Sequence, residues 1–151
     1  MKKAPDFTLQ NTDGNQVKLK DLTGEQNLVI LFFPLAFSGV CTKELCAARD
    51  NMKIYESLNA KVIGISVDSF FTLKAFKESQ NLNFLLLSDF NKEVSKKYDS
   101  LYKDFYGMKG VSKRSVFVIN KEGNLVYEQI LEDADQIPDF NKVQVVLAEL
   151  D

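Results

Sequence analysis

The two cysteines of the chain, Cys41 and Cys46, are the residues whose chemistry stands out first. Both lie in the stretch PLAFSGVCTKELC (34–46), and the chain contains no histidine. Without histidine, neither a Ser/His/Asp nor a Cys/His catalytic unit can form. Zinc usually takes four cysteine or histidine ligands in recognisable spacings, so we expect no metal and no other cofactor. A reactive thiol in this chain must therefore be activated by a different kind of group.

Two arginines are candidates for that group. The chain has 17 lysines but only Arg49 and Arg114 as arginines, and a planar guanidinium forms bidentate contacts that lysine cannot copy. Arg114 directly precedes a predicted strand beside the central one, so it can reach the same edge of the sheet as Cys41. Considered without the other residues, however, Arg114 is better explained as a solvated residue at the end of a strand than as a catalytic residue.

Cys41 falls in or just before the first turn of a predicted helix. Unpaired backbone N–H groups and the helix dipole favour a thiolate there. Ser38 and the backbone N–H groups of residues 38–41 are further donors that can be aimed at a transition state. Ser38 also fits a helix N-cap or a turn residue, and Pro34 alone needs no role beyond ending a strand.

A helical wheel of residues 40–58 separates the two cysteines. At 100° per residue, Cys41 and Glu44 fall on the apolar arc, whereas Cys46 falls on the polar arc. A buried carboxylate needs a partner such as an arginine, although Glu44 can also simply pair with the helix dipole. Five helical residues give roughly 7.5 Å of rise and about 140° of rotation, so the two cysteines can bond only if the helix unwinds. Cys46 also fits a small packed hydrophobe or an incidental surface residue.

The elements that must position these residues follow an α/β pattern. Alternation around Asp13 and Gly14 predicts an N-terminal hairpin over 7–19. Strands are predicted at 27–33, 61–68, 84–89, 115–120 and 125–130, helices at 40–58, 71–79, 92–98 and 136–150, and an irregular stretch at 101–114. This order predicts a mixed central sheet flanked by helices, in a single domain that spans 1–151. Ligands in such sheets bind beyond the carboxyl ends of the strands, where residues 34–41 lie.

The bulk composition excludes several classes of function. The chain of 151 residues has a net charge of −2, and its lysines are scattered, which argues against a nucleic-acid ligand. No apolar run approaches the roughly 18 residues that cross a bilayer. Pro5 and Asp6 stand where a signal peptide would need its apolar stretch, so we expect a cytoplasmic protein in a reducing compartment.

The segment FFPLAFSGVCTKELCAARD resembles the active-site segment of the peroxiredoxin family. The family pattern PxxxSxxC, with Thr or Ser in its middle place, is matched by Pro34, Ser38 and Cys41. The likeness extends over almost the whole chain, through APDFTLQNTDG, VIGISVDS, FLLLSD and RSVFVINKEG, the last of which supplies Arg114. PLAFSGVC looks like the bacterial alkyl hydroperoxide reductase E type, whereas CTKELC looks like the bacterioferritin comigratory protein type, also called peroxiredoxin Q.

This resemblance implies a thioredoxin-like fold and reduction of hydrogen peroxide, small organic hydroperoxides or peroxynitrite. Cys41 would be the peroxidatic thiolate that becomes a sulfenic acid. Ser38 and Arg114 would hold the peroxide, while Pro34 would shield the pocket. Glu44 matches a family position that orients the arginine.

The resemblance also implies how the enzyme is recycled. Cys46 would be the resolving cysteine, and a Cys41–Cys46 disulfide would be reduced by thioredoxin, a glutaredoxin-like protein or a low-molecular-weight thiol. Arg49 has a family parallel in a supporting role, and the implied assembly is a monomer or homodimer. Members of the first type often lack the second cysteine, so a one-cysteine enzyme that uses an external thiol stays open. A thioredoxin-like disulfide reductase is disfavoured because such enzymes use CxxC, and a non-catalytic redox sensor is a further alternative.

Overall fold

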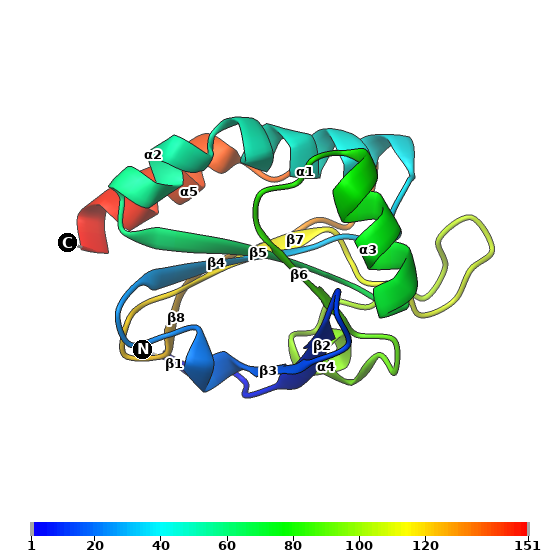
Figure 1. Ribbon diagram of the computed structural model, residues 1–151, viewed down its shortest axis with the longest axis horizontal. Helices are drawn as coiled ribbons and strands as arrows, with labels where there is room; N and C mark the ends of the chain where they lie inside the picture. Colours follow the sequence, from blue (N-terminus) through cyan, green and yellow to red (C-terminus); the bar gives the residue numbers. More distant parts are fainter. Residues whose placement is uncertain (1, 151) are drawn as a thin grey trace.

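The computed structural model describes residues 2–150, and within this range one mixed sheet of eight strands forms the centre of the molecule (Figure 1). In spatial order the strands are β1 (Lys2–Lys3), β8 (Asn124–Ile130), β7 (Ser115–Ile119), β4 (Asn27–Phe32), β5 (Ala60–Ser66), β6 (Leu85–Ser88), β2 (Thr8–Asn11) and β3 (Gln16–Lys18). Strands β4, β5 and β6 are parallel, and every other neighbouring pair is antiparallel. Strand β4 is buried along its whole length, as its continuous apolar run predicts.

Helices cover the two faces of the sheet unequally. They are α1 (Gly39–Asp50), α2 (Met52–Ser57), α3 (Phe70–Ser79), α4 (Glu93–Lys97) and α5 (Phe140–Leu150), with a 3-10 turn at Leu19–Asp21. Figure 1 shows α1, α2, α3 and α5 on one face of the sheet and α4 on the other, near the edge strands β2 and β3. Alternate residues of β4 point to opposite faces, so Leu31 packs under α1 while Ile30 and Phe32 pack against the N-terminal segment and α4.

Two of the predicted helices differ from the structure by more than one residue at an end. The predicted helix 40–58 is broken at Asn51, whose side-chain amide donates to the Ala47 carbonyl (2.9 Å) and so competes with the helical bonds. The predicted helix 136–150 begins only at Phe140. The residue before a proline is disfavoured in helical conformation, and Asp139, which follows Pro138, caps the helix by accepting the Lys142 N–H (3.1 Å).

The predicted N-terminal hairpin is confirmed, and the predicted strands 115–120 and 125–130 form a second hairpin. In the first, the side-chain oxygen of Asn11 accepts the N–H groups of Asp13 and Asn15, and Gly14 takes a positive φ of 82°. In the second, between β7 and β8, the side-chain oxygen of Asn120 accepts two N–H groups of the turn. The predicted α/β architecture with a mixed sheet is therefore correct, while the two-residue strand β1 was too short for the pattern to predict.

The sheet topology brings distant segments to one edge. Strand β7 runs antiparallel to β4, with Ser115 at its start paired to Phe32 at the end of β4. The chain therefore enters α1 and β7 at the same edge, which places residues 34–41 beside Arg114.

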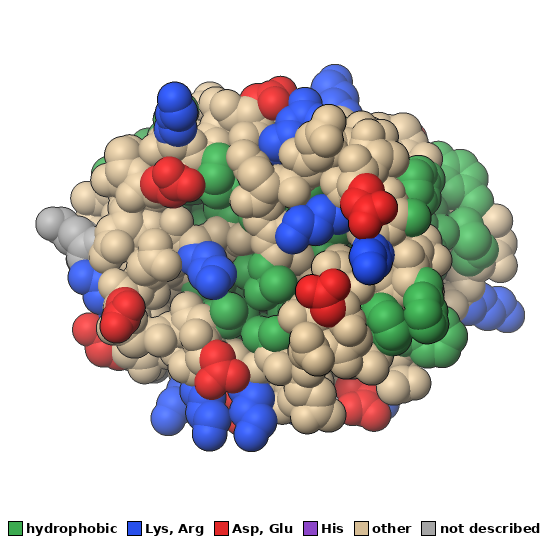
Figure 2. Space-filling model, viewed as in Figure 1, with side chains coloured by type: hydrophobic (Ala, Val, Ile, Leu, Met, Phe, Trp, Pro, Cys, Tyr) green, Lys and Arg blue, Asp and Glu red, His purple; other side chains and the backbone are tan. Residues whose placement is uncertain are grey.

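The surface carries mixed charge. Figure 2 shows Lys and Arg side chains interspersed with Asp and Glu side chains on the face viewed in Figure 1, while hydrophobic side chains gather at its right-hand end. Within residues 2–150 no helix is long and apolar enough to cross a membrane.

Candidate active site

Cys41 is the third residue of α1, and its side chain is fully buried in the core between the sheet and the helices. Its place in the first helical turn and its position on the inner side of the helix agree with the helical wheel. Glu44 lies one turn further along the same side and is also fully buried. The apolar arc of α1 therefore carries one thiol and one carboxyl group, both away from water.

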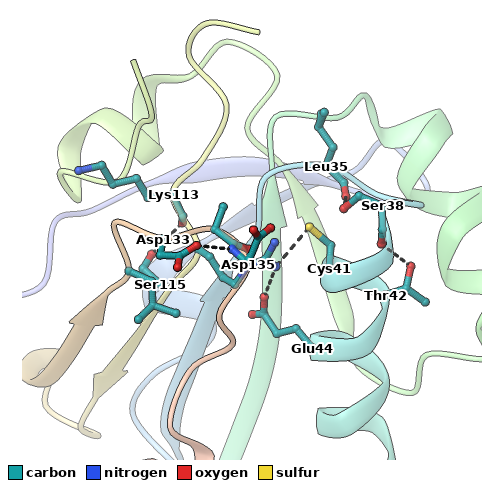
Figure 3. Close-up of polar contacts among 12 residues, drawn as sticks. Leu35, Ser38, Cys41, Thr42, Glu44, Lys113, Ser115, Asp133 and Asp135 are labelled. Carbon is teal, nitrogen blue, oxygen red and sulfur yellow. Dashed lines mark hydrogen bonds and ion pairs between the residues drawn. The ribbon is translucent and has the colours of Figure 1, made fainter. Parts of the chain in front are cut away.

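Arg114 joins these two groups. Its side chain is 1% exposed, and its Nη1 donates both to Cys41 Sγ (3.2 Å) and to Glu44 Oε1 (2.8 Å) (Figure 3). Its Nε donates to the carbonyl oxygen of Ala134 (2.9 Å), in the segment between β8 and α5. Arg114 thus contacts two residues that precede it in the chain by 73 and 70 positions.

The electrostatics of this buried group follow from its isolation from water. Burial raises the pKa of Glu44 from 4.5 to about 7, although the charge and hydrogen bond of Arg114 act in the opposite direction. Burial alone would lower the pKa of Arg114, but Glu44 and Cys41 outweigh this effect and raise it. Arg114 therefore stays charged. Within residues 2–150, Glu44 Oε2 is a buried side-chain oxygen with no hydrogen-bond partner, which adds to the cost of ionising this carboxyl group.

Ser38 and Pro34 lie in the loop that leads into α1. Pro34 is buried two residues after the end of β4. Ser38 occupies the N-cap position of α1 but makes no side-chain cap bond. The Ser38 hydroxyl instead donates to the Leu35 carbonyl oxygen (3.0 Å), so Ser38 is the N-cap residue by position and a turn residue by its side-chain hydrogen bond. The oxygen of Ser38 remains able to accept a hydrogen bond from a ligand.

Cys46 and Arg49 lie outside this group of contacts. The helical wheel places Cys46 among polar residues, but the end of α3 covers it. Cys46 is half-buried, packs against the core, and its Sγ donates to Gln80 Oε1 (3.6 Å). Arg49 donates to the Gln80 carbonyl oxygen (2.5 Å) and pairs with Asp50 (2.9 Å). Both cysteines are free thiols.

The sequence analysis missed two residues that support the site. Asp68 accepts the Ala36 N–H (2.7 Å) and so fixes the loop that carries Ser38, and burial raises the pKa of this carboxyl group. Its position just past the end of β5, at the edge where ligands bind, is a signal that would have identified it. Tyr102 accepts the backbone N–H of Arg114 (3.3 Å), and nothing in the irregular stretch around it pointed to this contact.

The family pattern described as AhpC/TSA matches residues 1–128. The chain belongs to the peroxiredoxin family. Peroxiredoxin Bcp of Bacillus subtilis (strain 168) is 39% identical over 128 residues, which are 83% of this chain and 81% of that protein. A protein of Mycobacterium tuberculosis (strain H37Rv) that carries the name peroxiredoxin is 39% identical over 130 residues, 84% of this chain and 82% of that protein.

The solved structures agree with the sequence relatives. The crystal structure of peroxidoxin BcpB from Mycobacterium tuberculosis matches with a TM-score of 0.88 and 27% identity, over 99% of this chain and 96% of that one. The predicted thioredoxin-like fold is therefore confirmed. As a peroxiredoxin, the protein is a thiol-dependent peroxidase that takes a peroxide as substrate and a thiol as reductant.

Proposed function

We propose that Cys41 is the peroxidatic residue of this peroxiredoxin. The observation that carries the proposal is the buried contact of its sulfur with Arg114 Nη1 at 3.2 Å. A thiolate at Cys41 attacks the terminal oxygen of the peroxide, and the S–O bond forms as the O–O bond breaks. The leaving group departs as water or an alcohol after taking a proton, or as nitrite when the substrate is peroxynitrite. Hydrogen peroxide, small organic hydroperoxides and peroxynitrite are the proposed substrates, because a sulfur with no exposed surface disfavours bulky peroxides.

The neighbouring residues take separate roles in this step. Arg114 stabilises the negative charge that develops on the departing oxygen, because its guanidinium is already held beside the sulfur. Ser38 accepts a hydrogen bond from the peroxide, while Pro34 shields the pocket from water. Glu44 orients the guanidinium through its 2.8 Å ion pair.

Cys46 is the proposed resolving residue. Its thiol attacks the sulfenic acid at Cys41, which releases water and leaves a disulfide that thioredoxin, a glutaredoxin-like protein or a small thiol reduces. The half-buried position of Cys46 against Gln80 supports this role, because the thiol lies near the surface where a reductant can meet it after α1 unwinds. Arg49 supports the end of the same helix through Gln80.

Single-cysteine variants test both assignments. We expect Cys41→Ser to lose peroxidase turnover by roughly a thousandfold or more, because the nucleophile is gone. Reduced protein treated with one equivalent of hydrogen peroxide should yield a Cys41–Cys46 disulfide on peptide mapping, and Cys46→Ser should yield sulfenylated Cys41 instead.

Three results would contradict parts of the proposal. Full turnover in Cys41→Ser would exclude Cys41 as the nucleophile. A free Cys46 beside sulfenylated Cys41 in the unaltered protein would identify a one-cysteine enzyme that relies on an external thiol. Oxidation that stops after one equivalent in the presence of a thioredoxin system would indicate a redox sensor.

A further inference from the structure

Residues 101–113, between α4 and β7, form a loop that folds back on itself. Tyr102 N–H donates to the Val111 carbonyl oxygen (2.9 Å), and Gly110 N–H donates to the Tyr102 carbonyl oxygen (3.0 Å). These two hydrogen bonds join the two ends of the loop, directly before the chain reaches Arg114. The side chain of Tyr102 therefore lies where this loop meets the candidate active site.

The Tyr102 hydroxyl bridges two segments of backbone. It accepts the N–H of Arg114 (3.3 Å) and donates to the Leu131 carbonyl oxygen (2.8 Å), in a side chain that is 7% exposed. Leu131 N–H in turn donates to the Arg114 carbonyl oxygen (2.9 Å). The backbone of Arg114 is thus tied at both its polar groups to the same small network.

This network continues to the guanidinium. Three residues after Leu131, the carbonyl oxygen of Ala134 accepts Arg114 Nε (2.9 Å), and this segment runs beside Cys41 and Glu44 (Figure 3). Because Nε and Nη1 belong to one rigid plane, a shift of the Ala134 carbonyl would turn Nη1 away from the sulfur. The orientation of the Arg114 guanidinium therefore depends on the position of the segment that follows β8.

The ring of Tyr102 supports the other side of the site. Together with Val67 and Val111 it forms a small buried cluster, against which Leu35 and Ala134 pack. Leu35 belongs to the loop that leads into α1. Burial raises the pKa of Tyr102, so its hydroxyl keeps the proton that it donates.

We propose that Tyr102 is a positioning residue for the peroxide reaction, and that its hydroxyl holds Arg114 in register with Cys41. The proposal rests on the role proposed above for Arg114. Tyr102 itself does not touch the reacting atoms. It acts by fixing the backbone of Arg114 to the segment that receives Nε.

Removal of one hydroxyl group tests this role. Tyr102→Phe keeps the ring, and Tyr98→Phe is the matched control, because Tyr98 is equally buried and donates to the Pro5 carbonyl oxygen (2.7 Å) on the opposite face of the sheet. We expect Tyr102→Phe to slow oxidation of the reduced protein by hydrogen peroxide about tenfold, and Tyr98→Phe to stay within about twofold of the unaltered rate. Equal slowing in both variants, or none in Tyr102→Phe, would overturn the proposal.

The variant Arg114→Lys separates this role from the proposed function itself. A slow Arg114→Lys beside an unaltered rate in Tyr102→Phe would refute the positioning role alone, whereas an unaltered rate in Arg114→Lys would refute both. If Tyr102 acts through the guanidinium, adding Tyr102→Phe to Arg114→Lys should cause no further slowing. Additive slowing would show a general structural contribution and would overturn the positioning role.

Arginine NMR gives a readout that does not depend on turnover. With only two arginines in the chain, Arg49→Lys assigns the two Nε–H signals. We expect the Arg114 Nε–H signal to shift and to exchange faster with solvent in Tyr102→Phe, while Tyr98→Phe leaves it unchanged. An unchanged signal in Tyr102→Phe would show that the hydroxyl does not hold the guanidinium.

Discussion

One guanidinium nitrogen serves two partners in this site. Arg114 Nη1 donates to Cys41 and to Glu44 at once, in a region without exposed surface. When Glu44 is ionised, its negative charge competes with a thiolate for the same donor. When Glu44 is protonated, the full charge of Arg114 is available to the sulfur. The protonation state of one carboxyl group therefore sets the charge balance around the sulfur of Cys41.

The pairing of these residues could be predicted from their scarcity and their spacing. A chain with two cysteines and two arginines offers few combinations, and the helical wheel places Cys41 and Glu44 on one side. Scarcity and spacing do not single out Asp68 and Tyr102, although the position of Asp68 just past the end of a strand is itself a signal. Their contacts depend on the paths of two loops, and no periodic pattern encodes the path of a loop.

Glu44 predicts a pH dependence of stability. Between pH 4.5 and about 7 the folded protein holds a proton on Glu44 that the unfolded chain has released, so the free energy of unfolding falls as the pH rises through this window. The effect amounts to at most about 3 kcal/mol. Urea unfolding of the reduced protein at several pH values should therefore show a flatter pH profile for Glu44→Gln than for the unaltered protein.

The matched control is Glu132→Gln, whose carboxylate is 78% exposed in its pair with Lys113. This variant should keep the full slope. A weaker slope of the same sign should remain in Glu44→Gln, because burial also raises the pKa of Asp68. Parallel profiles for Glu44→Gln and the unaltered protein would show that Glu44 is ionised throughout.

At the scale of elements, α1 is held at both ends by different partners. Its first turn carries Cys41 against Arg114, and its second half is tied to the end of α3 by Cys46 and Arg49, which both contact Gln80. A 41–46 disulfide requires the first of these regions to unwind and the thiol of Cys46 to leave Gln80. The contacts between α1 and α3 thus oppose the proposed resolving step.

Loss of the Gln80 side chain should speed resolution. In Gln80→Ala the thiol of Cys46 has no hydrogen bond to the Gln80 side chain that must break before it can react. We therefore expect disulfide formation after sulfenylation to become about two- to tenfold faster. Rapid-quench mass spectrometry of reduced protein mixed with hydrogen peroxide measures this step separately from sulfenylation. Gln16→Ala, on β3 at the far edge of the sheet, should leave both rates unchanged, and a slower resolving step in Gln80→Ala would show that Gln80 assists Cys46 instead.

At the scale of the whole molecule, the central sheet is the part of the fold that the sequence patterns predicted best. The apolar run of β4 and the alternation of the hairpins set the sheet, because buried surface fixes which side of a strand faces inward. Helix ends were predicted less well, since side chains such as Asn51 and Asp139 compete for backbone groups locally. The predicted position of β7 beside the central strand β4, on which the meeting of Arg114 and Cys41 depends, is confirmed by the pairing of these two strands.

The same architecture predicts that oxidation destabilises the protein. A disulfide that closes the short loop from Cys41 to Cys46 contributes only about 2 kcal/mol by restricting the unfolded chain. Unwinding of this part of α1 removes Leu45 from the core and breaks the buried Glu44–Arg114 ion pair, which together cost more than that. We therefore expect the disulfide form to melt about 5–10 °C below the reduced form.

Calorimetry of reduced protein and of protein oxidised with one equivalent of peroxide measures this difference. Hydrogen exchange should show where the difference arises, with protection lost in α1 and retained in β4 and β7. These two strands are paired with each other and also pack against a second hydrophobic cluster on the face of the sheet away from α1. Cys46→Ser cannot form the intramolecular disulfide, so its α1 should stay protected after the same treatment. A disulfide form that melts above the reduced one, with α1 still protected, would mean that the two cysteines bond without unwinding the helix.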